Sequence, residues 1–159
     1  MQASHGAVSP PVAAAFATVL FFALVVAGFG LLSLREGAEV IGVPGLGQAP
    51  GVIAMIAAVL AFATGAFLVV RRPRPTYPAT VGVVAGTFLA YTAGIVVCAV
   101  LSGAEPARAA AAAGGFVTSW FAVALASAAL VCGWGAVALV RTRAQRPRWP
   151  WEDRERRDG

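Results

Sequence analysis

Residues 82–102 read GVVAGTFLAYTAGIVVCAVLS, an apolar stretch without a single charged residue. About 20 apolar residues are enough for an α-helix to cross the hydrocarbon core of a bilayer, so this stretch predicts a membrane-spanning helix. Every fourth residue in it is small, and residues four apart lie on one ridge of a helix, where another backbone can approach closely. This small-residue ridge, a predicted helix-packing surface, consists of Gly82, Gly86, Ala90, Gly94, Cys98 and Ser102.

Long apolar segments recur through the whole chain of 159 residues, of which only 12% are charged. Soluble domains carry about 25% charged residues, so the composition indicates an integral membrane protein. The predicted spans are residues 11–34, 51–70, 80–103 and 116–140. The predicted fold is all-α: a single polytopic transmembrane domain of four helices in an antiparallel bundle, with a cytoplasmic tail at 141–159. Residues 104–115, between the last two spans, predict a short helical extension at the surface.

The arginines predict the orientation of these spans. The net charge is +5, and 12 residues are basic, all of them Arg. All but Arg35 and Arg108 follow the second or the fourth span, and segments rich in Arg normally stay on the cytoplasmic side. We therefore predict a multi-pass protein of the cell membrane with both termini in the cytoplasm.

The basic segments also predict contact with lipid headgroups. An anionic inner leaflet attracts each nearby Arg by about 1 kcal/mol, and Trp favours the headgroup zone. The alternative for the tail is a docking motif whose tryptophans fill pockets on a protein partner. The predicted membrane-surface residues are Arg71, Arg72, Arg74, Arg141, Arg143, Arg146, Arg148, Trp149 and Trp151.

Hydroxyl side chains inside the spans form a candidate polar path. Thr87 and Tyr91 fall in a narrow band of the third span together with Cys98. A hydroxyl in lipid needs a partner, which is either a ligand or, as we expect, a group on a neighbouring helix. The candidate residues are Thr87, Tyr91, Thr92, Ser119 and Ser127.

The sequence lacks the residues that several kinds of function need. None of the four spans contains Asp, Glu, Lys, Arg or His, although proton-coupled carriers and ion pumps usually need an ionisable group at membrane depth. The chain resembles the small multidrug transporters in helix number but lacks the carboxylate that they carry in the first span. The only histidine is His5, so we expect no catalytic triad, no metal or cofactor site and no enzyme activity.

The Ala- and Val-rich body, the glycine-rich segment after the first span and the tail from Arg148 to Glu152 together resemble a known group. They are similar to small uncharacterised four-span membrane proteins of actinobacteria. This resemblance implies a source and an architecture but no known activity.

Two hypotheses for the function follow. The first is a structural or accessory membrane protein that binds other membrane proteins or a second copy of itself, because its spans are free of charge and carry the small-residue ridge. The second is a small channel or carrier that uses the uncharged polar path. Both involve the lipid bilayer, and neither involves nucleic acid.

Overall fold

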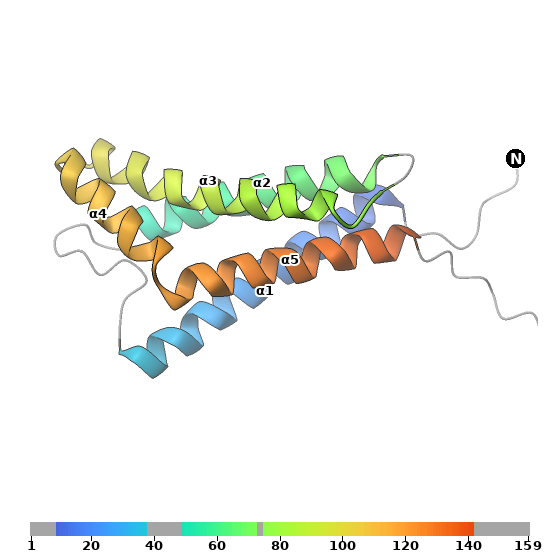
Figure 1. Ribbon diagram of the computed structural model, residues 1–159, viewed down its shortest axis with the longest axis horizontal. Coiled ribbons are helices and arrows are strands. Elements are labelled where there is room, and N and C mark those ends of the chain that lie inside the picture. Colours follow the sequence, from blue (N-terminus) through green and yellow to red (C-terminus); the bar gives the residue numbers. More distant parts are fainter. Residues whose placement is uncertain (1–8, 38–48, 73–74, 142–159) are drawn as a thin grey trace, which may run out of the picture.

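The computed structural model describes residues 9–37, 49–72 and 75–141, and all regular secondary structure within these ranges is helical. The prediction of an all-α fold is therefore confirmed for the described residues. Figure 1 shows the helices in chain order: α1 (Pro10–Glu36), α2 (Ala49–Val70), α3 (Ala79–Leu101), α4 (Pro106–Val117) and α5 (Trp120–Arg141).

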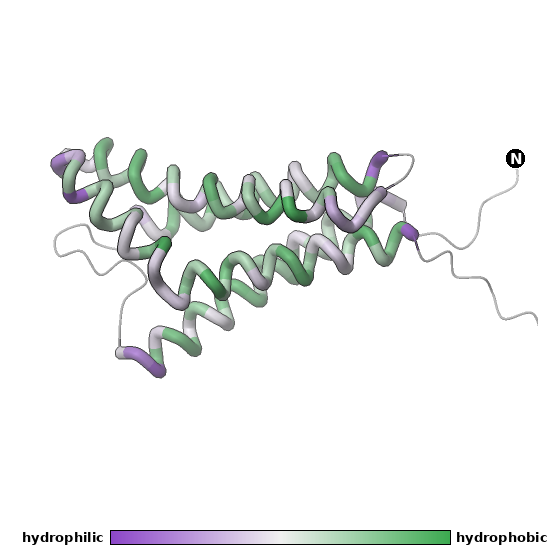
Figure 2. Tube along the Cα trace, viewed as in Figure 1, coloured by the Kyte–Doolittle hydropathy of each residue, from purple (hydrophilic) through white to green (hydrophobic). Residues whose placement is uncertain are grey.

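Four of these helices, α1, α2, α3 and α5, are long and apolar enough to cross a membrane. Figure 2 shows that hydrophobic residues run along the middle of the bundle and that hydrophilic residues gather at helix ends. Many large apolar side chains point outward, such as Phe16, which is 68% exposed, and Leu89, which is 66% exposed. Lipid is as apolar as these side chains, so their exposure agrees with a membrane bundle.

Proline and glycine set the limits of the helices. Pro10 and Pro106 begin α1 and α4, where the missing backbone N–H of proline removes no helical hydrogen bond. Helix α1 ends at Glu36 and is capped by Gly37, whose φ of 59° lies in the left-handed region that glycine adopts without strain.

The fourth predicted span differs from the structure at its start. The prediction began this span at Phe116, whereas α5 begins at Trp120 and Phe116 belongs to the separate helix α4. Helix α4 has 12 residues, too few to cross a bilayer, and it turns back along α3 (Figure 1). Its buried face consists of Ala109, Ala112, Ala113 and Phe116. Because this face packs on the bundle, the segment is more than an extension on the surface.

The bundle consists of two helix pairs. Helices α2 and α3 form the most extensive contact and α1 and α5 the next, and each pair is antiparallel (Figure 1). Small side chains let α2 and α3 approach closely: a Cβ atom built on Gly94 would lie 2.7 Å from the Cα atom of Ala54. A second close approach occurs where Gly65 meets the side chain of Val83, 3.2 Å from a Cβ built on the glycine.

Aromatic rings fill the space between the two pairs. Phe21 of α1 stacks on Phe62 of α2 with the ring centroids 4.4 Å apart. Nearer α4, the ring of Phe29 meets Phe121 edge-on, with a centroid separation of 5.4 Å. These rings are buried, and they are among the largest side chains of the interior.

We predict that Gly94→Ala lowers the stability of the folded chain. The new methyl group would meet the backbone of Ala54 at 2.7 Å, so α2 and α3 would have to separate. Overpacking of this kind costs about 1–3 kcal/mol. Reversible unfolding in detergent would measure the loss.

Gly30→Ala is the matched control, because a Cβ on this exposed helical glycine would meet no atom within 4 Å. It should leave the free energy of unfolding unchanged or raise it slightly. Equal losses in the two variants would contradict a close contact at Gly94.

Candidate functional site

The structure divides the small-residue ridge between the inside and the outside of the bundle. Gly94 and Cys98 are buried, whereas Gly82, Gly86 and Ser102 are exposed and Ala90 is half-buried. Within the described residues, only Gly94 and Cys98 of the ridge are fully buried in the bundle, so a packing role for its exposed members stays a prediction.

Helix geometry explains this division. A helix turns by about 100° per residue, so a four-residue repeat drifts by about 40° at every step. From Gly82 to Gly94 the drift reaches about 120°, which carries the row of small residues around α3. Helix α2 covers only one side of α3, so it reaches Gly94 and leaves the two earlier glycines uncovered.

The uncovered glycines belong to an outward α3 stripe, which we define as Gly82, Gly86, Leu89 and Ala93. These residues follow the spacing i, i+4, i+7 and i+11, which keeps them within about 60° of one another on the helix. All are exposed, and a Cβ built on either glycine would meet no atom within 4 Å. The stripe is thus a shallow apolar surface that no described part of this chain covers.

The Thr and Ser hydroxyls of the candidate polar path donate to backbone carbonyls three or four residues earlier in the chain. Thr87 donates to the carbonyl of Val83 at 2.7 Å, and Thr92 donates to that of Phe88 at 2.9 Å. The hydroxyls of Ser119 and Ser127 donate in the same way to carbonyl oxygens three or four residues earlier: Phe116, 2.7 Å from Ser119, and Val123, 2.7 Å from Ser127.

The structure brings only some residues of this candidate path close together. Thr87 and Tyr91 are buried one turn apart on α3, whereas Ser127 is exposed on α5. Beside Tyr91 lie the rings of Phe116 and Phe29, with centroids 4.4 and 6.0 Å away. Sequence reasoning missed this aromatic cluster, because its members come from three helices and share no spacing along the chain.

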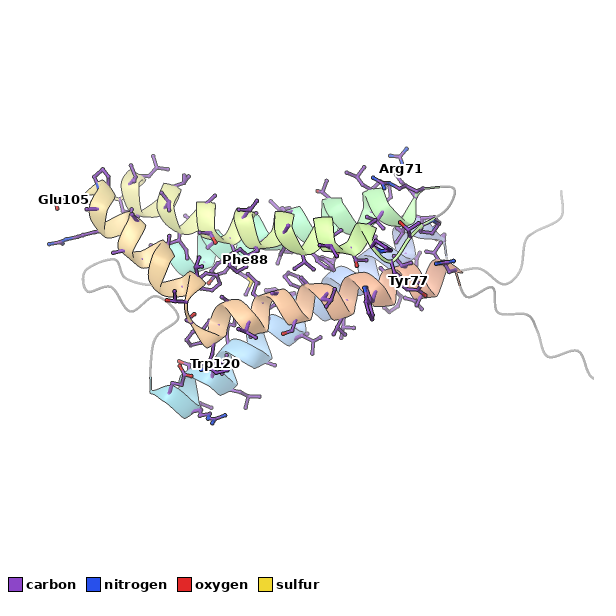
Figure 3. All side chains as sticks on the ribbon, viewed as in Figure 1. Arg71, Tyr77, Phe88, Glu105 and Trp120 are labelled. Carbon is purple, nitrogen blue, oxygen red and sulfur yellow. The ribbon has the colours of Figure 1, made fainter. Side chains whose placement is uncertain are left out.

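The predicted membrane-surface residues lie at one end of the bundle, as far as the structure describes them. We call this the basic end. The guanidinium carbon of Arg71 lies 5.4 Å from the ring centroid of Phe67, and that of Arg141 lies 5.2 Å from the centroid of Tyr77. Figure 3 shows Arg71 and Tyr77 at this end and Glu105 at the opposite end.

The ring of Tyr77 also contacts Trp134, with the centroids 6.0 Å apart. Arg72 is exposed at the same end. The other predicted membrane-surface residues lie outside the described residues: Arg74, Arg143, Arg146, Arg148, Trp149 and Trp151.

A comparison with protein families identifies the relatives of this chain. A family model matches residues 9–159. The chain belongs to DUF6121, a family of unknown function. No curated protein and no solved structure matches it. The predicted resemblance to an uncharacterised family thus agrees with the match, and the actinobacterial source stays a prediction.

Two surfaces of this DUF6121 chain therefore remain on which a function can be based. The outward α3 stripe offers close approach to another helix within the membrane. The basic end offers positive charge beside aromatic rings at the limit of the apolar helices.

Both cysteines, Cys98 and Cys132, are free and buried, which agrees with their interpretation as packing residues.

Proposed function

We propose that this membrane protein has a structural or accessory role and binds a second copy of itself, or another membrane protein, through the outward α3 stripe. The observation that carries the proposal is that two glycines one turn apart on α3, Gly82 and Gly86, are both exposed and have open space in front of them. In lipid, helices associate by close packing of small residues, and the stripe has the spacing that such packing uses.

Energetics support a contact at these glycines. Glycine within a helix costs about 1 kcal/mol relative to alanine. At Gly94 the close contact with α2 accounts for the absence of a side chain, because a Cβ there would collide with Ala54. At Gly82 and Gly86 no such contact exists among the described residues. A partner helix would give the two exposed glycines the same role.

The alternative function, a small channel or carrier with an uncharged polar path, has less support. The Thr and Ser hydroxyls already bond to backbone carbonyls three or four residues earlier, which leaves their oxygens less available to a passing solute. Buried rings occupy the interior beside Tyr91. The proposed role requires no catalytic residue and no cofactor.

For the orientation, we propose that the basic end lies at the cytoplasmic face of the cell membrane. The described arginines at this end are Arg71, Arg72 and Arg141. The positive-inside rule and attraction to anionic lipid both support this placement, and the arginine-rich tail adds to the charge on the same side.

We predict that Gly86→Leu weakens self-association. The leucine side chain would hold the partner helix away, and misfits of about 1–3 kcal/mol lower a dimerisation constant roughly 5- to 150-fold. Cross-linking in liposomes over a series of protein-to-lipid ratios would measure the change. Gly30→Leu is the matched control, since Gly30 is also exposed with open space around it and lies on α1.

A wild-type chain that stays monomeric at every ratio would exclude a second copy as the partner. Capture of another membrane protein that Gly86→Leu abolishes, and Gly30→Leu does not, would then support the accessory role. Failure of both assays would contradict the proposal.

We predict that liposomes containing the purified protein show no protein-dependent flux of ions or small uncharged solutes. The Thr and Ser hydroxyls that a path would need are already bonded to nearby backbone carbonyls. Dye-release and stopped-flow assays would test this expectation. A flux that Thr87→Val or Ser127→Ala reduces would instead favour the channel or carrier.

We predict that a reporter fused after Gly159 is active only in its cytoplasmic form. The prediction follows from the arginines that come after the second and fourth spans. Paired fusions to a cytoplasmic and a periplasmic reporter would measure the side. Periplasmic activity at this position would overturn the proposed orientation.

A further inference from the structure

An apolar groove lies between α3 and α5, on the outside of the bundle. Its volume is about 430 Å³, within the range of about 300–1,000 Å³ typical of ligand sites. The only polar side chain in its wall is Ser127, whose hydroxyl already bonds to the Val123 carbonyl. The wall consists of Val84, Phe88, Val117, Ala122, Val123, Ala126, Ser127 and Leu130. Such a surface suits a hydrocarbon chain.

The face of α5 that forms part of the groove wall continues beyond Leu130 toward the basic end. Val123, Ser127, Leu130, Trp134 and Arg141 lie within about 60° of one another at 100° per residue. Trp134 is 53% exposed on this face, next to the wall of the groove. The apolar wall and the positive charge therefore belong to one continuous surface.

Two aromatic rings, Tyr77 and Trp134, lie next to the positive charge of Arg141. The centroid of the Tyr77 ring lies 6.0 Å from that of Trp134 and 5.2 Å from the Arg141 guanidinium carbon. Trp and Tyr favour the headgroup level of a bilayer, and a guanidinium is a strong hydrogen-bond donor to phosphate. This arrangement matches the headgroup of an anionic phospholipid.

The length of α5 between Trp134 and the far end of the groove fits one acyl chain. From Trp134 to Val123 the rise of α5 is about 16 Å at 1.5 Å per residue. Half of a hydrocarbon core of about 30 Å is about 15 Å. The Arg141 guanidinium lies beside the Tyr77 ring, which contacts Trp134. A lipid whose phosphate binds this guanidinium can therefore extend one chain from the level of Trp134 along the groove to the middle of the membrane.

We infer that the groove between α3 and α5 and the Arg141–Tyr77–Trp134 cluster form a binding site for one anionic phospholipid. The acyl chain lies in the groove and the phosphate binds the Arg141 guanidinium. This inference rests on the proposed placement of the basic end at a membrane surface and not on the helix-docking role. Val84, in the groove wall, lies about 160° around α3 from Gly82 and Gly86, so the two surfaces are separate.

The test uses Trp134 as the only fluorophore in the full chain, after Trp120, Trp149 and Trp151 are changed to Phe. The protein is placed in bilayers that contain either phosphatidylglycerol or phosphatidylcholine with brominated acyl chains, which quench a tryptophan they touch. At equal mole fractions, we expect the anionic lipid to bind about fivefold more strongly, the factor that corresponds to about 1 kcal/mol for one Arg.

Two variants, each with a matched control, assign the effect to the site. Arg141→Gln should abolish the preference for the anionic lipid, whereas Arg71→Gln should keep it, because Arg71 stacks on Phe67 of α2 instead. Ala126→Leu should fill part of the groove and reduce quenching by both lipids, while Ala23→Leu, at an exposed position on α1, should not.

Equal quenching by the two lipids, or an unchanged preference in Arg141→Gln, would overturn the inference. Circular dichroism would check that each variant folds. If Ala126→Leu does not fold, Arg141→Gln still tests the inference, because Arg141 is exposed. Cross-linking of Arg141→Gln should match that of the unmodified chain, so a failure of the lipid site stays distinct from a failure of helix docking.

Discussion

The close approach of α2 and α3 at Gly94 and Ala54 is the contact on which the rest of the bundle depends. Helices in lipid gain little from burying apolar surface, since the lipid is equally apolar, so backbone proximity and tight packing must hold them together. A Cβ at Gly94 would lie 2.7 Å from the Ala54 backbone, which leaves no room for any larger residue. This contact fixes how the two helices of the central hairpin sit against each other.

Aromatic packing then joins this hairpin to the α1–α5 pair. Phe21 and Phe62 stack across α1 and α2, while Tyr91 meets rings from α1 and α4. The second cluster explains why α4 turns back along α3: Phe116 is buried against Tyr91, and this burial offsets the cost of two glycines in a short helix. The interior is thereby filled with rings rather than with polar groups.

Helix α3 carries two surfaces of different chemistry. The glycines of the outward stripe present bare backbone, which favours another helix. Val84 and Phe88 instead form one wall of the groove beside α5, which favours a flexible chain. Because these surfaces face in opposite directions, one helix has room for a protein contact and a lipid contact at the same time.

The sequence by itself determined the number of spans and the all-helical class, because apolar length is a local property of the chain. It also indicated that Gly94 and Cys98 are packing residues, yet it assigned the same role to Gly82 and Gly86. Only the tertiary structure decided which glycines meet a neighbour, because a four-residue repeat drifts around the helix while α2 covers one side. The start of α5 and the proximity of Tyr77, Trp134 and Arg141 likewise depend on contacts between segments far apart in the sequence, which no local pattern records.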